Sequence, residues 1–288
     1  MVTTTQHSCQ HHAPQTPNPA AKEAEVITPH RRFDRLVRLT GAEGFTRLRA
    51  AHVAVYGLGG VGSFAAESLA RSGVGTLTVV DFDDVCVTNT NRQLHALKGN
   101  VGKPKAYIMR ERLQLVDPQA VIHAKRAFYN GARADQLIPS DLGFAIDAID
   151  NISAKAHLLA TLTARRIPVV TCLGSAGKWD PTRIQVAPLH QTHTCGLARA
   201  LKKILREKYA LAPEDSGITA VFSDEQRRGP FPVPYDGEEG FRCVCPNGDN
   251  GVNECEEKSV IDGSASFVTG AFGLFAASVV VRQICEGG

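Results

Sequence analysis

The chain has 288 residues, of which 43% are hydrophobic, an ordinary share for a globular protein and enough for a substantial core. The formal net charge of +3 permits a nucleic-acid partner without requiring one. Eight unevenly spaced cysteines do not form a disulfide framework, so we expect a reducing, cytoplasmic environment. The apolar runs fall short of the ~18 residues that a membrane helix needs, and no membrane association is predicted.

Residues 1–29 are rich in Thr, His, Gln and Pro and show no apolar periodicity. This composition predicts a disordered tail without the charged and apolar regions of a secretory signal. Whether the tail is a targeting segment of another kind stays open. Residues 30–288 are expected to form a single domain, which begins with a basic amphipathic helix around Arg32 to Leu39.

A glycine-rich stretch follows the apolar run 53–56, which predicts a short buried strand, and precedes a helical pattern over 63–71. Strand, glycine turn and helix form the opening of a nucleotide-binding βαβ unit. Glycines are needed in the turn because side chains would keep the backbone amides away from phosphate oxygens. The candidate phosphate-binding residues are Gly57, Gly59, Gly60 and Gly62.

A second strand over 76–80 ends on Asp81. An acidic residue at this place in a βαβ unit commonly accepts hydrogen bonds from a ribose hydroxyl. The glycine turn alone is a weak signal, but strand, turn, helix and Asp81 together predict a nucleotide site.

The remaining elements alternate between strands and helices, which predicts an α/β fold with a Rossmann-like, doubly wound, mainly parallel sheet. The expected elements are a helix from Gly102–Lys105 to about Leu115, strands at 121–124, 144–149 and 169–172, and a helix over 153–166. An antiparallel extension is expected at 179–187, and an amphipathic helix from Cys195 to about Tyr209. A polar, lid-like loop insertion near 226–260 precedes a C-terminal buried helix.

Two cations argue against a dinucleotide and for a triphosphate. Arg92 and Lys105 are surplus to a dinucleotide site, but they suit the attack on ATP, in which pyrophosphate gains negative charge. Asp150, at the tip of the fourth strand, is placed to hold Mg²⁺ together with phosphate oxygens. Asn89 is placed to donate to a phosphate or to the adenosine.

Five short motifs carry a resemblance to a known superfamily. They are the glycine stretch 57–62, Asp81-Phe82-Asp83-Asp84-Val85, Asn89-x-x-Arg92-Gln93, Gly102-x-x-Lys105 and Asp150-Asn151. In this order they resemble the adenylyltransferases of ubiquitin activation and of molybdopterin and thiamine biosynthesis. Segments 84–93 and 145–150 resemble the branch of tRNA threonylcarbamoyladenosine dehydratases. The resemblance runs from about Arg31 to the C-terminus and is weakest across the loop insertion.

The resemblance implies a role for each candidate residue. Asp81 would bind the ribose; Asn89, Arg92 and Lys105 would contact the triphosphate; and Asp150 would serve Mg²⁺. These enzymes are homodimers, and Arg35 matches the arginine that reaches into the ATP site of the neighbouring subunit.

The implied reaction adenylates the carboxylate of a threonylcarbamoyl group on a tRNA adenosine beside the anticodon. A nucleophile within the modification then displaces AMP and closes a ring. A second reading is an adenylyltransferase that activates the C-terminal glycine of a ubiquitin-like sulfur-carrier protein. A third is an NAD-dependent oxidoreductase or nucleotide-binding regulator, in which Arg92 and Lys105 would have no evident role.

The cysteines depart from one pattern within the superfamily. Zinc-bearing relatives carry two Cys-x-x-Cys pairs, whereas this chain has Cys243, Cys245 and Cys255 in the polar loop. These thiols would bind a metal, change redox state or remain free, and free thiols are the favoured interpretation.

The helix after Cys195 carries a basic stripe. Its cations recur at helical spacing on one face, with little acid in the helix to compensate them: Arg199, Lys202, Lys203 and Arg206. A solvated face is the ordinary interpretation. Because like charges at this spacing repel, contact with tRNA phosphates is the functional alternative.

Overall fold

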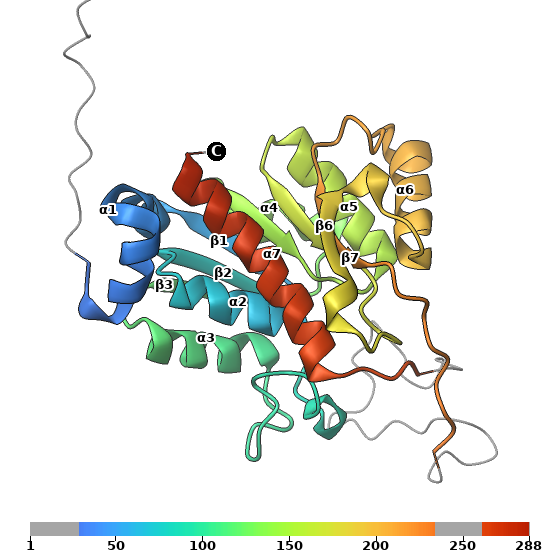
Figure 1. The fold of residues 1–288 in the computed structure, drawn as a ribbon, viewed down its shortest axis with the longest axis horizontal. Coiled ribbons are helices and arrows are strands. Elements are labelled where there is room, and N and C mark those ends of the chain that lie inside the picture. Colours follow the sequence, from blue (N-terminus) through green and yellow to red (C-terminus); the bar gives the residue numbers. More distant parts are fainter. Residues whose placement is uncertain (1–28, 234–260, 288) are drawn as a thin grey trace, which may run out of the picture.

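A computed structural model describes residues 29–233 and 261–287, and within these residues a seven-stranded sheet runs through the molecule (Figure 1). Its strands lie in the order β3-β2-β1-β4-β5-β7-β6. They are β1 (His52–Tyr56), β2 (Thr76–Asp81), β3 (Val121–Arg126), β4 (Phe144–Asp147), β5 (Val169–Cys172), β6 (Ile184–Pro188) and β7 (Thr219–Ser223). The pairs are parallel except for β6 and β7, which confirms the predicted mainly parallel sheet with an antiparallel extension.

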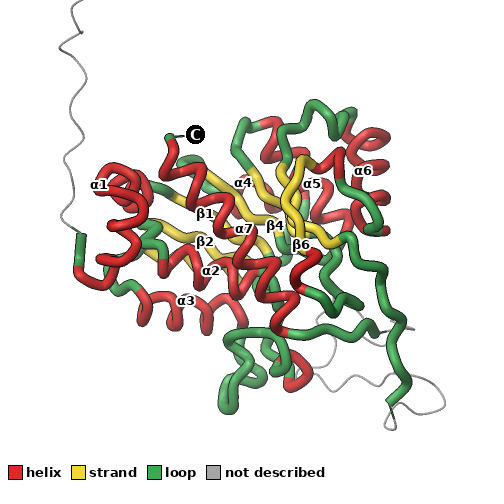
Figure 2. Tube along the Cα trace, viewed as in Figure 1, coloured by secondary structure: helices red, strands yellow, loops and turns green. Residues whose placement is uncertain are grey.

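Helices cover both faces of the sheet, which confirms the doubly wound arrangement (Figure 2). They are α1 (Asp34–Ala50), α2 (Gly62–Arg71), α3 (Lys105–Val116), α4 (Ala134–Leu137), α5 (Ile152–Ala164), α6 (Gly196–Tyr209) and α7 (Ser266–Glu286). One face carries α2, α3 and α7, and the other carries α4, α5 and α6. The winding reverses between β1 and β4, and ligands of such sheets bind at this point, beyond the carboxyl ends of the strands.

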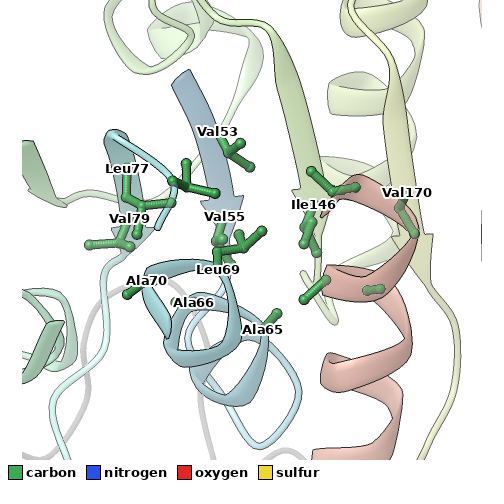
Figure 3. Packing of buried hydrophobic residues seen from close by; sticks show 14 of the residues in the cluster. Val53, Val55, Ala65, Ala66, Leu69, Ala70, Leu77, Val79, Ile146 and Val170 are labelled. Carbon is green, nitrogen blue, oxygen red and sulfur yellow. The ribbon is translucent and has the colours of Figure 1, made fainter. Parts of the chain in front are cut away.

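Alternate residues of the central strands enter different cores. Val53 and Val55 of β1 pack toward α2 and α7, whereas Ala54 and Tyr56 pack toward α4, α5 and α6. Figure 3 shows the first core, in which Leu69 of α2 lies against the sheet. Because both faces are buried, the strand reads as a continuous apolar run rather than as an alternating one.

The C-terminal helix α7 packs against the glycine turn and the first turn of α2. It has 21 residues and is long and apolar enough to cross a membrane, so it exceeds the apolar run expected from the sequence. Within the molecule, however, Phe272 and Ala276 are fully buried against the sheet, which confirms the predicted buried helix. Gly273 lets α7 approach α2 closely, because a Cβ there would lie 2.3 Å from the carbonyl oxygen of Val61.

One strand and several element boundaries differ from the sequence expectations. β7 was not expected, yet it lies between β5 and β6 and pairs with both. Strand β4 stops at Asp147 instead of continuing to residue 149, because the Asp147 carboxylate accepts the amide of Ile149 and turns the chain. The extension expected at 179–187 begins with a 3-10 turn at Pro181–Arg183, and only its later part joins β6.

Some expectations lie outside the described residues. They are most of the tail 1–29, the greater part of the loop insertion 226–260, and Cys243, Cys245 and Cys255.

Candidate active site

The turn between β1 and α2 requires glycine for steric reasons. Gly57 has a φ of 86°, and a Cβ there would lie 2.7 Å from the carbonyl oxygen of Ala148. A Cβ at Gly62 would lie 1.7 Å from the carbonyl oxygen of Gly57. At Gly59 the nearest atom to a Cβ is Nε2 of Gln93 at 4.0 Å, so this side of the turn is open to a ligand. Helix α2 has no side-chain cap, so apart from the amide of Ser63, which donates to the carbonyl oxygen of Gly59 at 3.1 Å, side chains leave its first amides available to an anion.

Asp81 ties the end of β2 to the glycine turn. Its Oδ2 accepts the amide of Leu58 at 2.6 Å and its Oδ1 accepts the amide of Asp83 at 2.8 Å. Burial raises the pKa of Asp81, while the charge of Lys105 acts to lower it. Each carboxylate oxygen keeps a further lone pair, so the group retains the capacity to accept a ribose hydroxyl.

Lys105 begins α3 and lies almost completely buried beside two carboxylates. Its Nζ donates to Oδ2 of Asp83 at 2.8 Å. Burial lowers the pKa of Lys105, but the charges of Asp81 and Asp83 outweigh burial and hold the pKa above its usual value. The ammonium is therefore charged. It lies at the carboxyl edge of the sheet.

Arg92 lies across the glycine turn and has no carboxylate partner among the described residues. Its Nη1 donates to the carbonyl oxygen of Thr88 at 2.9 Å and to Oδ1 of Asn91 at 3.0 Å, and its Cγ lies 3.2 Å from the Cβ position of Gly60. Burial lowers the pKa of Arg92, although an arginine this close to the surface stays charged. Arg92 is therefore a cation without a local counter-charge at the phosphate-binding turn.

Two amide side chains complete this part of the site. The Oδ1 of Asn89 accepts the amide of Cys86 at 3.0 Å, which leaves the Asn89 amide nitrogen as a donor. Gln93, which the sequence analysis did not select, is buried next to Gly59, and its Oε1 has no hydrogen-bond partner in the described part of the chain. The signal was its place beside Arg92 in the motif.

Asp150 lies on the exposed loop beyond β4, at the same edge of the sheet, and its charge raises the pKa of Lys105. Within residues 29–233 and 261–287, no group of three or more His, Cys, Asp or Glu residues is arranged to hold a metal ion. Mg²⁺ commonly binds through one or two carboxylates together with substrate phosphates. A single exposed carboxylate therefore fits a magnesium ion that arrives with a nucleotide, and not a preformed metal cage.

A buried ion pair beneath Asp150 was missed by the sequence analysis. Lys155 of α5 donates to Oδ2 of Asp147 at 2.6 Å and to the carbonyl oxygen of Cys172 at 3.0 Å. Thr171 donates to the same carboxylate oxygen at 2.7 Å. The signal was that Lys155 is the one Lys, Arg, Asp or Glu residue in α5. The network fixes the carboxyl ends of β4 and β5 to α5 and so positions the loop that carries Asp150.

Arg35 does not join the site within this chain. It is exposed on α1, just after Phe33, which packs near Gly73 at the far end of α2. The ten residues of α2 separate this end from the glycine turn by about 15 Å. The other predicted nucleotide-binding residues lie together at the carboxyl edge of the sheet.

The predicted basic stripe lies on α6, and part of its charge is already compensated. Lys202 donates to the carbonyl oxygen of Thr192 at 2.7 Å, and Arg206 pairs with Glu214 at 2.6 Å. Arg199 and Lys203 are exposed. Lys203 also lies 3.9 Å from Glu207 of the same helix, whereas the partners of Lys202 and Arg206 lie outside the helix, where helical spacing could not indicate them.

The ThiF family matches residues 33–286 of this chain. The tRNA threonylcarbamoyladenosine dehydratase of Haemophilus influenzae is 36% identical over 266 residues, which cover 91% of this chain and 97% of that protein. The enzyme of the same name from Escherichia coli is 37% identical over 256 residues, covering 88% and 93% of the two chains. The crystal structure of the E. coli dehydratase, TcdA, in complex with ATP aligns with a TM-score of 0.75 and 35% identity over 89% of this chain and 94% of that chain. The glycine turn and its surrounding charges thus occur in a chain that belongs to the ThiF family.

Proposed function

We propose that the protein is an ATP-dependent tRNA threonylcarbamoyladenosine dehydratase that acts in the cytoplasm. The observation that carries the proposal is the convergence of Asp81, Arg92 and Lys105 on an open glycine turn. The dehydratase relatives align along about nine-tenths of the chain, which supports this substrate over others in the superfamily.

The site would first bind ATP. Asp81 accepts a hydrogen bond from a ribose hydroxyl, and the amides at the start of α2 donate to phosphate oxygens. Arg92 has no acidic partner in the described residues, so it can contact a phosphate without first breaking an ion pair. Lys105 would exchange Asp83 for a phosphate oxygen, and Asn89 donates through its free amide nitrogen.

The chemistry then activates a poor electrophile. The carboxylate of the threonylcarbamoyl group attacks the α-phosphorus, and the bond to pyrophosphate breaks. Arg92 and Lys105 offset the negative charge that grows on the leaving group. Mg²⁺, held by Asp150 and the phosphates, would neutralise further phosphate charge. A nucleophile of the modification attacks the acyl-adenylate, AMP leaves, and the ring closes with net loss of water.

The active enzyme would be a homodimer. Arg35 lies about the length of α2 from its own glycine turn, so it is available to the site of a partner subunit. An arginine supplied in this way would add positive charge at the triphosphate of the other subunit.

The tRNA would contact the stripe on α6. Arg199 and Lys203 are exposed, and Lys202 and Arg206 would add to the field of this face. Contacts of this type position the substrate without reading its bases.

The alternative substrate is a ubiquitin-like sulfur-carrier protein with a C-terminal glycine. An ATP–pyrophosphate exchange assay distinguishes the two substrates when it is run with modified tRNA, with a small carrier protein and with neither. We expect exchange and AMP formation with tRNA alone. Exchange that depends on the carrier protein would overturn the proposal in favour of the alternative, and absence of exchange with both would exclude adenylation.

A further inference from the structure

An exposed aromatic cluster lies beyond the carboxyl end of β5. Trp179 is 58% exposed, and its ring meets the 48% exposed ring of Phe267 edge to face, with centroids 5.2 Å apart. The guanidinium carbon of Arg228 lies 5.9 Å from the centre of the Trp179 ring. We call Trp179, Phe267 and Arg228 the aromatic platform. Its members come from three distant segments of the chain.

The backbone beneath the aromatic platform is fixed by hydrogen bonds. The amide of Gly177 donates to the carbonyl oxygen of Gly263, and the amide of Arg228 donates to the carbonyl oxygen of Gly177, both at 2.8 Å. The carboxylate of Glu225 accepts the amide of Trp179 at 2.9 Å. A side chain that is exposed on so constrained a backbone is preorganised for contact with a ligand.

The aromatic platform adjoins the nucleotide site. Thr269 follows Phe267 in the first turn of α7, and its Oγ1 lies 2.9 Å from the Cβ position of Gly60. Asn91, next to Arg92, donates from Nδ2 to the carbonyl oxygen of Ser264 at 2.9 Å. Figure 1 shows the amino-terminal end of α7 beside the loop that follows β2. The first turn of α7 therefore carries both a contact with the glycine turn, through Thr269, and a member of the aromatic platform, Phe267, on different sides of the helix.

The charges around the aromatic platform are largely balanced. Arg228 lies 3.3 Å from Glu225, Arg183 pairs with Asp224 at 2.7 Å, and Arg227 pairs with Asp262. An anion alone would gain little here. What the surface offers is the face of an indole and the plane of a guanidinium, and unpaired nucleobases stack on both.

We propose that the aromatic platform stacks an unpaired base of the tRNA anticodon loop next to the adenosine that reacts. The inference rests on the proposed function, because an adenosine beside the anticodon brings neighbouring single-stranded bases to this edge of the sheet. Arg228 covers one part of the Trp179 ring and Phe267 supports its edge, so the base occupies the exposed face. The aromatic platform would thereby set the register of the loop over the ATP site.

The chain contains a single tryptophan, so its fluorescence reports on the aromatic platform alone. Titration with an anticodon stem-loop RNA that carries threonylcarbamoyladenosine should quench this fluorescence. In a label-based binding assay, Trp179→Leu should weaken RNA binding about 5- to 150-fold, the usual effect of removing one stacking aromatic, whereas Trp179→Phe should lose less. ATP binding without RNA should not change.

A matched control exists on α3, where Arg110 lies 5.8 Å from the ring centre of the exposed Tyr107. Tyr107→Leu should leave RNA affinity within about twofold, since this pair is not part of the aromatic platform. The partner base is identified with RNAs that carry an abasic site at one loop position at a time. At the stacked position, the abasic RNA should bind weakly to the wild type, and Trp179→Leu should add no further loss.

Failure of the aromatic platform is separable from failure of the proposed function. If AMP forms with tRNA but fluorescence is not quenched and Trp179→Leu binds RNA normally, base stacking on the aromatic platform is contradicted and the enzyme assignment stands. Quenching without AMP formation would support base stacking on the aromatic platform and contradict the proposed dehydratase activity. A change of oligomeric mass in Trp179→Leu, with unchanged RNA binding, would assign the cluster to contact between protein copies and overturn the inference.

Discussion

Two lysine–aspartate pairs at the carboxyl edge of the sheet differ in their access to solvent. Lys105 and Asp83, beside the glycine turn, have side chains that are 7% and 35% exposed. Lys155 and Asp147, at the ends of α5 and β4, are completely buried. The first pair belongs to the half of the sheet formed by β1 to β3, which we call the nucleotide half. The second pair belongs to the other half, formed by β4 to β7.

The difference in exposure separates a pair that can exchange partners from one that cannot. Asp83 is accessible to water, so Lys105 is able to release it for a phosphate at modest cost. Asp147 has no such alternative, because its carboxylate is enclosed by Lys155 and Thr171. We therefore expect the first pair to affect catalysis and the second to affect folding.

The largest effect is expected from Lys155→Met, which leaves the buried Asp147 carboxylate without a counter-charge. Loss of one partner of such a pair typically costs about 3–5 kcal/mol in the free energy of unfolding. Urea unfolding measures this cost, with Lys105→Met as the matched control, for which we expect less than half the loss. Equal losses in the two variants would remove the distinction between the pairs.

The next largest effect concerns catalysis in the nucleotide half. Arg92→Ala and Lys105→Ala should each lower the rate of AMP formation by about 10²–10³, because each removes a preorganised charge near the leaving group. Arg92→Ala should unfold at nearly the same urea concentration as the wild type, since Arg92 contacts mainly its own loop. Near-normal turnover in both variants would be incompatible with the ATP site.

Acid sensitivity should also arise in the nucleotide half. Burial, together with the charges of Lys105 and Arg112, lowers the pKa of His95 to about 3, and both ring nitrogens lack partners in the described residues. The unfolded chain binds a proton below about pH 6.5 that the folded chain does not, so stability present at neutral pH is lost as the pH falls. His95→Leu should reduce the loss between pH 7 and pH 5 by about 2 kcal/mol. Urea unfolding at the two pH values checks this, and an unchanged loss would assign the acid sensitivity elsewhere.

A mixing experiment tests whether the nucleotide half is complete within one subunit. If Arg35 serves the partner's site, Arg35→Ala and Asp150→Ala proteins should together regain up to about a quarter of normal activity, because half of the random pairs are mixed dimers and each contains one intact site. Mass spectrometry verifies that subunits exchange. Exchange without any return of activity would place Arg35 outside the shared site.

The smallest effect should come from the other half, on α6. Changing both Lys202 and Lys203 to Glu should weaken tRNA binding and flatten the plot of log affinity against log salt. Among single changes, Lys203→Gln should reduce the slope by about 0.7–0.9 and Lys202→Gln by less, because Lys202 is held by a backbone carbonyl. ATP binding in the absence of tRNA is the control. An unaltered slope in the double variant would make α6 an ordinary solvated helix.

The sequence by itself determined the order and type of the elements in the nucleotide half, with the exception of small shifts at their ends. Gly57 to Gly62, Asp81 and Lys105 lie at the ends or beginnings of successive elements, and parallel strands bring such positions to one edge of the sheet. The alternation of strands and helices was therefore enough to predict the fold class and the edge of the sheet where these residues meet, without knowledge of any long-range contact. The resemblance added the branch, which the residues alone did not identify.

Only the tertiary structure decided features that depend on contacts between distant segments. β7 became recognisable as a strand through pairing with β5 and β6. Asp147 ended β4 and became a buried partner of Lys155 because α5 returns over the sheet, and Lys202 was compensated by a carbonyl of the preceding loop. Trp179 met Phe267 from the far end of the chain. Local propensity reports backbone preference, whereas the burial and pairing of a charge depend on which other segments the fold brings to it.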